Sequence, residues 1–221
     1  MLNYLNDLAE KHVMTLEDPI EYNLIERHCV LNQLEIGIDT PNFKKALRAM
    51  LLQKPDIILI GETRDADTFE TSISAAETGY LVFNTLRAAS AQQAIIRLFE
   101  YFPLNKHELV RCKLSDSPRG IVVQKLLRSL KGDSRIPAQE IRVVDSIVGS
   151  TIKEGKFDKI QSLLDVLPES GSRSFDKELF RLVNEDKVSK GDALQNSPNR
   201  QGLEMNLKVI FLSESYRIIV N

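Results

Sequence analysis

The sequence predicts an α/β fold in which a mostly parallel sheet is followed by a helical subdomain. In the first half of the 221 residues, short apolar runs alternate with helical patterns, which is typical of a parallel sheet flanked by helices. Acidic residues stand at or just beyond the ends of two of these apolar runs. From Lys106 onward the pattern becomes mostly helical.

Three apolar runs are predicted to be strands: Val13–Glu17, Ile57–Ile60 and Leu81–Leu86. Between the second and the third, apolar residues recur at helical spacing. We expect Asp67 to cap this helix and Gly79 to stand where it ends. The segment is therefore predicted to be a β-α-β unit.

A second helical pattern begins at Ser90 and is stopped by Pro103. Its apolar residues Ile95, Phe99 and Phe102 form one stripe, which we interpret as core rather than as a cofactor site.

The remainder is predicted to hold one strand near Gln139–Val143, a polar break at Pro168–Ser174 and two short helices within Ser174–Pro198. No element is assigned to the apolar runs of the last twenty residues. The predicted parts are an α/β core (1–144), a helical subdomain (145–198) and a divergent tail (199–221).

Composition excludes several classes of function. The formal net charge of −2 gives no reason to expect a nucleic-acid groove or an anionic membrane surface as the main partner. Cys29 and Cys112 have neither disulfide-framework nor zinc-ligand spacing. No apolar run approaches the roughly 20 residues that span a bilayer, and no signal pattern is present. We expect a cytoplasmic protein without direct membrane insertion.

The densest acidic cluster is Thr15-Leu16-Glu17-Asp18-Pro19-Ile20-Glu21, at the end of the first predicted strand. These residues leave two interpretations open. Asp18, Pro19 and Glu21 have the spacing of a helix capping box. Alternatively, Glu17 stands at the carboxyl end of a strand, where open α/β sheets place their ligand crevice.

The second cluster runs from Ile57 through Gly61 and Glu62 to Asp65. An apolar strand that delivers a carboxylate is what a Walker B element needs. Such a carboxylate binds magnesium through water or polarises the attacking water of a phosphoryl transfer. An acid after one strand is common, but acids after two predicted strands favour a nucleotide site.

A phosphate-binding loop of the form G-x-x-x-x-G-K-[ST] is not present in the sequence. The nearest segment, Gly149 to Gly155-Lys156, has one residue too many between its glycines. It also has Phe157 where a hydroxyl must meet magnesium. We reject it as a phosphate site.

Four longer segments carry a specific resemblance. They are TLEDPIEY at Thr15–Tyr22, NQLEIGIDTPNFKKALRA from Asn32, PDIILIGETRD from Pro55 and AAETGYLVFNTL from Ala75. In order and spacing they resemble the PilT/PilU pilus retraction ATPases, within the type II and type IV secretion ATPases. The match covers most of residues 1–130, and Ser174–Pro198 is similar to the family's C-terminal helices.

The resemblance implies a RecA-like P-loop NTPase core, incomplete here, within a hexamer of identical or related PilT/PilU-like subunits. ATP with Mg²⁺ would bind between neighbouring subunits. Its hydrolysis would drive pilus retraction (twitching motility) through an inner-membrane platform protein. The implied location is the cytoplasm, peripheral to the inner-membrane pilus base.

The family's acidic residues are carried over onto both clusters. The resemblance makes Glu17 and Glu62 the acids that position magnesium and the attacking water, and either can be the general base. Asp18, Glu21 and Gly61 are implied to be associated with the nucleotide or magnesium. Magnesium would be held through ATP rather than by protein ligands alone.

Arg48, Arg64 and Arg97 are implied candidates for charge neutralisation or for contacts in the ring. The chain departs from the family pattern at Leu52, where a second arginine is expected. Leucine cannot neutralise a developing phosphate charge.

Three further departures concern the nucleotide and the helices. Tyr80 and Arg87 occupy the positions of the family's two histidines, which are thought to sense the γ-phosphate. The resemblance places the phosphate loop a few residues before Met1. It also implies one continuous helix around Pro118, where proline would kink it at a cost of roughly 3 kcal/mol or more.

Three functions remain open at this stage. The chain is part of a retraction ATPase, a catalytically inactive ring subunit or regulatory binding module, or a decayed gene product. We expect no tight ATP binding and no activity from this chain alone, because a phosphate loop supplies most of the grip on the β- and γ-phosphates.

Overall fold

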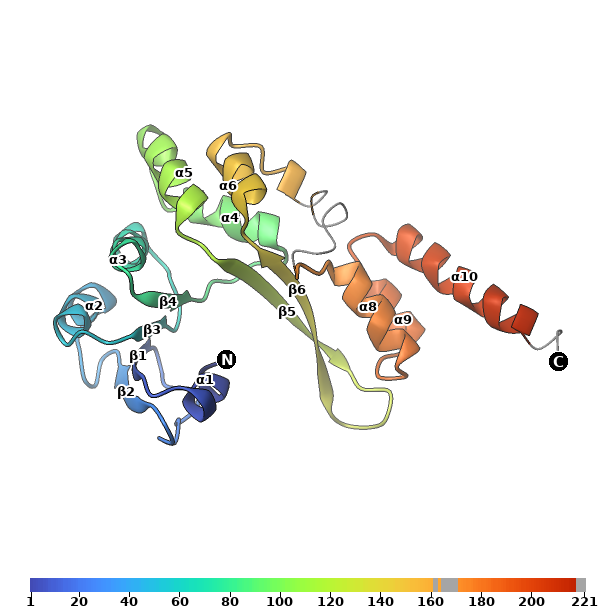
Figure 1. Cartoon of the computed structure of the whole chain (residues 1–221), viewed down its shortest axis with the longest axis horizontal. Helices are drawn as coiled ribbons and strands as arrows, with labels where there is room; N and C mark the ends of the chain where they lie inside the picture. The colour runs from blue at the N-terminus through green and yellow to red at the C-terminus, as the bar shows by residue number, and fades with distance from the viewer. Residues whose placement is uncertain (161–162, 164–170, 218–221) are drawn as a thin grey trace. The chain divides into compact units, whose positions relative to one another are not determined.

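The computed structural model describes residues 1–160, 163 and 171–217. The chain separates into two units. The first comprises Met1–Arg87 and Arg97–Ser117, and the second comprises Ala88–Ile96 and Pro118–Asn221. One of the three boundaries between them falls within helix α4 (Ala91–Glu100) (Figure 1).

The first unit is built on a parallel four-stranded sheet in the order β2-β1-β3-β4. Its strands are β1 (His12–Glu17), β2 (Val30–Glu35), β3 (Ile57–Ile60) and β4 (Leu81–Asn84). The predicted parallel sheet is confirmed. β2 is a strand that the sequence analysis did not predict, and it forms one edge of the sheet.

Helices connect and cover these strands. They are α1 (Leu2–Leu8), α2 (Phe43–Leu52), α3 (Ala66–Glu77), the end of α4, a 3₁₀ turn at Leu104–Lys106 and α5 (His107–Asp116). In Figure 1, α2 and α3 lie side by side next to the sheet, in agreement with their packing contacts. The predicted β-α-β unit is β3-α3-β4.

Alternate residues of the strands face two separate apolar clusters, because successive side chains of a strand point to opposite faces. Val13 and Ile57 pack on one face with Leu2 and Leu5 of α1. The alternate strand residues Met14, Leu16, Ile58 and Ile60 pack on the opposite face. Their partners there are Leu47 and Met50 of α2 and Ala75 of α3. Both faces of the sheet are therefore covered within this unit.

The predicted start of α3 is wrong. The N-cap of α3 is Asp65, whose side chain accepts a hydrogen bond from the backbone N–H of Thr68 at 2.8 Å. Asp67 lies in the first turn instead and pairs with Lys44. Of the two interpretations left open for the first acidic cluster, the capping box at Asp18 is not formed, because the chain after β1 continues as an irregular segment.

The apolar stripe predicted after Ser90 is confirmed as core. Ile95, Phe99 and Phe102 are all buried. Phe102 also meets Phe69 of α3 edge to face, with ring centroids 6.1 Å apart. Aromatic pairs favour this arrangement.

The second unit contains an antiparallel hairpin and a set of helices. The hairpin consists of β5 (Gly120–Arg128) and β6 (Arg135–Val143). The helices are α6 (Ser146–Lys153), α8 (Phe175–Asn184), α9 (Lys190–Asn196) and α10 (Arg200–Arg217). The two short helices predicted within Ser174–Pro198 are confirmed as α8 and α9.

The prediction of mostly helical structure from Lys106 is wrong over the hairpin. The predicted strand Gln139–Val143 is the second half of β6, and β5 was missed. Pro118 does not kink a helix, because α5 ends at Asp116 and the chain then enters β5. Part of the predicted polar break at Pro168–Ser174 lies outside the described residues.

Glu140 is a fully buried carboxylate in the second unit. It lies on β6, and its Oε1 accepts a hydrogen bond from the backbone N–H of Ala91 at 3.2 Å. Its Oε2 has no hydrogen-bond partner among the described residues. Burial raises the pKa of Glu140, although Ala91 and the nearby charges of Arg142 and Lys125 oppose the shift.

We expect Leu47→Ala to lower the free energy of unfolding by about 2–5 kcal/mol, because it leaves a cavity beneath α2. Leu47 is completely buried, whereas Leu52 on the same helix is 84% exposed. Leu52→Ala is the matched control and should change stability by no more than about 0.5 kcal/mol. Urea denaturation of both variants measures the difference, and equal effects would contradict the assigned core.

We expect Glu140→Gln to become more stable relative to the unsubstituted chain as the pH rises from 4.5 towards 7. A raised pKa means that the folded state holds its proton more tightly than the unfolded state. Stability contributed by protonated Glu140 is therefore present below its ordinary pKa of 4.5 and is lost as the pH rises through the folded pKa. Urea denaturation across this range tests it. A constant difference between the two proteins would contradict the prediction.

Candidate functional site

The carboxyl ends of β1, β3 and β4 lie at one edge of the sheet because the strands are parallel. The register pairs Leu16 with Ile60 and Ile60 with Asn84. The residues that follow in each strand, Glu17 and Gly61, therefore stand at the same level. From β1 the chain continues to β2 on one side, whereas β3 continues to β4 on the other. The point between β1 and β3 is thus where strand order reverses, which is where open α/β sheets bind ligands.

Gly61 allows β1 and β3 to approach each other closely at this edge. Its backbone N–H donates to the carbonyl of Leu16 at 2.7 Å. A Cβ at position 61 would stand 3.1 Å from both Glu17 Cα and the Leu16 carbonyl oxygen. The carbonyl of Gly61 accepts a hydrogen bond from the hydroxyl of Thr85, after β4. Gly61 therefore holds three strand ends together through its backbone.

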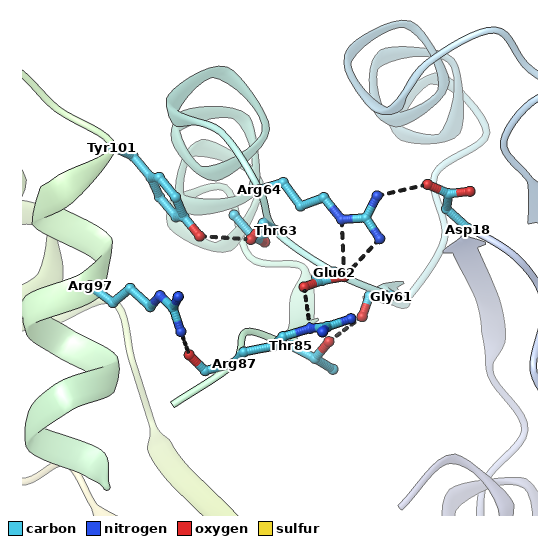
Figure 2. A network of polar contacts seen from close by, with 9 residues as sticks. All are labelled: Asp18, Gly61, Glu62, Thr63, Arg64, Thr85, Arg87, Arg97 and Tyr101. Atoms are coloured by element: carbon cyan, nitrogen blue, oxygen red, sulfur yellow. Dashed lines mark hydrogen bonds and ion pairs between the residues drawn. The ribbon is translucent and has the colours of Figure 1, made fainter. Parts of the chain in front are cut away.

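Glu62, the next residue, is paired with two arginines. Its Oε2 accepts hydrogen bonds from Nε and Nη2 of Arg64 at 3.0 and 2.8 Å, and its Oε1 accepts one from Nε of Arg87 at 3.0 Å. Figure 2 shows both guanidinium groups at this carboxylate. Hydrogen bonding to Arg64, followed by the charges of both arginines, lowers the pKa of Glu62 despite its partial burial. Glu62 is therefore ionised at neutral pH.

Arg64 connects the acidic residues of two strand ends. Besides binding Glu62, its Nη1 donates to Oδ2 of Asp18 at 3.0 Å (Figure 2). Its two acidic partners raise the pKa of Arg64. Arg64, which the resemblance made a candidate for charge neutralisation or ring contacts, thus bridges the two acidic clusters.

The side chain of Glu17 is oriented towards β2, the edge strand beside β1. Its Oε1 accepts hydrogen bonds from the Thr15 hydroxyl at 2.6 Å and from Nε2 of Gln33, on β2, at 3.0 Å. Glu62 is held instead by Arg87, after β4. The two carboxylates therefore flank the reversal point but are oriented by different strands.

The loop that carries Glu62 is fixed by contacts on both sides. The backbone N–H of Thr63 donates to the Thr85 carbonyl at 2.9 Å, and the hydroxyl of Tyr101 donates to the Thr63 carbonyl at 3.1 Å. Asp65 then caps α3. The acid consequently lies between a strand and a capped helix.

The structure joins some of the predicted site residues and separates others. Glu62, Arg64 and Asp18 form one network, and Arg97 reaches it by donating from Nη1 to the backbone carbonyl of Arg87 (Figure 2). Three others lie outside this network. Glu17 is bound to Thr15 and Gln33 instead. Arg48 is exposed on α2, and Glu21 is exposed in the segment after β1.

Arg87 is the network residue that sequence reasoning missed as a partner. The resemblance identified position 87 only as a departure from histidine. Its place opposite Glu62 depends on the pairing of β3 with β4, which sets Ile60 beside Asn84. The signal that could have indicated it was an arginine directly after the predicted strand Leu81–Leu86, which is three residues beyond the observed end of β4 at Asn84.

Comparison with known proteins gives a consistent relationship. The family described as "Type II/IV secretion system protein" matches residues 1–170. The chain is 34% identical over 203 residues to the twitching motility protein of Neisseria gonorrhoeae, with 92% of this chain and 54% of that protein covered. It is 36% identical over 197 residues to the type IV pilus retraction ATPase PilT of Pseudomonas aeruginosa, covering 89% and 57%. The chain thus spans about half the length of these curated relatives.

Solved structures agree with this relationship. The crystal structure of the pilus retraction motor PilT with bound ADP aligns with a TM-score of 0.83 at 38% identity, over 93% of this chain and 58% of that chain. The Legionella pneumophila ATPase DotB aligns with a TM-score of 0.71 at 26% identity, over 83% and 50%. The predicted α/β fold class is therefore confirmed.

In the part of the chain that the structure describes, none of the helices has both the length and the apolar character required to cross a bilayer.

We expect Gly61→Ala to lower the free energy of unfolding by about 1–3 kcal/mol, because the added methyl group forces β1 and β3 apart. Gly191→Ala is the matched control, since a Cβ there meets only Ser189 Oγ at an ordinary 3.8 Å. Thermal or urea unfolding of both variants measures the effect. A Gly61→Ala protein as stable as the control would show that the close approach is not required.

Proposed function

Because this chain belongs to the type II/IV secretion system protein family, we propose that it is the motor-domain part of a type IV pilus retraction ATPase. In this proposal the whole protein couples ATP hydrolysis to pilus disassembly. The chain contributes the acidic and arginine-bearing side of the nucleotide site. The 38% identity to a retraction motor with bound ADP supports this assignment.

The observation that carries the proposal is the arrangement of acids at the reversal point. Glu17 ends β1 and Glu62 follows β3, on adjacent parallel strands held together at Gly61. Both strand ends are positioned by backbone hydrogen bonds. Such preorganised carboxylates can orient a water molecule without rearranging during the reaction.

The groups present fit a magnesium nucleotide by their chemistry. Carboxylates bind magnesium directly or through water, and guanidinium groups bind phosphate oxygens in a bidentate manner. Glu62, Arg64, Arg87 and Arg97 belong to one hydrogen-bonded network that offers both kinds of group. When bound, ATP with Mg²⁺ supplies the transferable phosphoryl group and the divalent charge. The sequence contains no G-x-x-x-x-G-K-[ST] segment, so the proposal assigns no phosphate loop to this chain.

The proposed roles follow from charge and position. Glu62 or Glu17 accepts the hydrogen bond of the attacking water and acts as general base. Arg64 and Arg97 neutralise phosphate charge, Arg64 through its positive charge alone while it stays paired with Glu62 and Asp18. Asp18, Glu21 and Gly61 shape the acidic edge around the nucleotide and its magnesium.

The proposed assembly is a hexamer of PilT/PilU-like subunits in the cytoplasm, acting on an inner-membrane platform protein at the pilus base. Arg48, exposed on α2, is the proposed ring contact. The proposed functional parts are residues 1–144 as the ATPase core, 145–198 as the helical subdomain and 199–221 as a divergent tail.

The alternative is a catalytically inactive ring subunit or regulatory module. The specific observation that favours it is that both oxygens of Glu62 are occupied by arginines. Tyr80, Arg87 and Leu52 also replace the three polar side chains that the family resemblance led us to expect. A ring subunit of this kind would keep the fold and the contacts while contributing less chemistry.

A chimera separates the two functions. Residues 1–144 of this chain would replace the matching segment of the P. aeruginosa PilT relative. A boundary after residue 144 keeps the β5–β6 hairpin intact, because β6 ends at Val143. We expect magnesium-dependent ATP hydrolysis, and we expect Glu62→Gln in the chimera to lower kcat by about a hundredfold or more, since a positioned base contributes on this scale.

Arg128→Gln, on the exposed side of β5, is the control and should leave turnover unchanged. A chimera that assembles and binds nucleotide but hydrolyses no ATP would favour the inactive subunit. Turnover that does not respond to Glu62→Gln would contradict the role of this acid.

A further inference from the structure

The two arginines that pair with Glu62 are held very differently. Arg64 gives two hydrogen bonds to Glu62 and a third to Asp18. Arg87 gives a single side-chain hydrogen bond, from Nε to Glu62. Arg64 is 52% exposed, whereas the side chain of Arg87 is 83% exposed. The weaker and more accessible pair is therefore the one with Arg87.

The backbone at Arg87 is anchored independently of its side chain. Its carbonyl oxygen accepts a hydrogen bond from Nη1 of Arg97, on α4. Within the described residues, Nη1 and Nη2 of Arg87 make no hydrogen bond. The guanidinium group can thus change partner while the main chain stays in place.

We propose that Arg87 binds a polyphosphate and that Glu62 competes with the polyphosphate for Arg87. An incoming diphosphate or triphosphate would then draw Arg87 away and free Oε1 of Glu62. The inference rests on the proposed function for the nucleotide as the source of the phosphate. It concerns a step that precedes any hydrolysis. Arg64 remains on Oε2 throughout, because it is bound to two acids.

Charge and geometry favour this exchange. A diphosphate carries more negative charge than one carboxylate and offers several oxygens to the two free nitrogens of Arg87. An ion pair as exposed as Arg87–Glu62 contributes little stability in water. After the exchange, Glu62 remains ionised beside Arg64, and its released oxygen can accept a hydrogen bond from water.

The test is a calorimetric titration of the purified chain with inorganic pyrophosphate in magnesium-free buffer. If Glu62 competes for Arg87, Glu62→Gln should bind pyrophosphate about fivefold more tightly than the unsubstituted chain. Arg87→Gln should bind it about tenfold more weakly. The variant with both substitutions should bind pyrophosphate no more tightly than Arg87→Gln alone. Arg128→Gln, on β5, is the control for the loss of one positive charge and should match the unsubstituted chain.

A second readout follows the arginine side chains by NMR. The Nε–H signal of Arg87 is identified by its absence from the spectrum of Arg87→Gln. Pyrophosphate should shift this signal, whereas the Nε–H signal of Arg64 should stay in place. Equal affinities of Glu62→Gln and the unsubstituted chain, or no binding by either, would overturn the inference. Because magnesium and hydrolysis are absent from this experiment, its outcome is separate from the ATPase activity of the chimera.

Discussion

The close approach of β1 to β3 at their carboxyl ends is the constraint on which the site depends. The hydrogen bond from Gly61 N–H to the Leu16 carbonyl fixes Gly61 beside the end of β1, and this determines where Glu62 is placed at the edge of the sheet. The same glycine receives the hydroxyl of Thr85 through its carbonyl, so β4 is bound at this level as well. The positions of Glu62 and of the residue opposite it, Arg87, both follow from this three-strand junction.

Much of the site could be predicted because it is encoded locally. An apolar strand followed by an acid can be recognised from neighbouring residues alone, and this indicated both Glu17 and Glu62. The partners of these acids come from other strands, and a strand register is set by tertiary packing rather than by local sequence. Gln33 and Arg87 were therefore not predicted as their partners, since β2 was missed and the register between β3 and β4 could not be derived.

The second unit shows the same limit on a larger scale. The apolar residues of β5 fit neither a helical nor an alternating period clearly, and their conformation depends on pairing with β6 beyond the hairpin turn. In contrast, a short helix was predicted where α8 lies, and its capping Ser174 and amphipathic pattern are contained within one segment. Asp65 and Asp67 illustrate an intermediate case. Both aspartates can cap a helix, and only the backbone geometry at Asp65 decides between them.

Arg97 binds the main chain at position 87 and not the side chain. The path of this loop is consequently insensitive to which amino acid occupies that position. A different side chain could be exchanged there during evolution, from imidazole to guanidinium for example, while the neighbouring acid and strand junction kept their geometry. In the role proposed for Arg87, position 87 is thus a place where the affinity for a phosphate can change while the surrounding backbone stays the same.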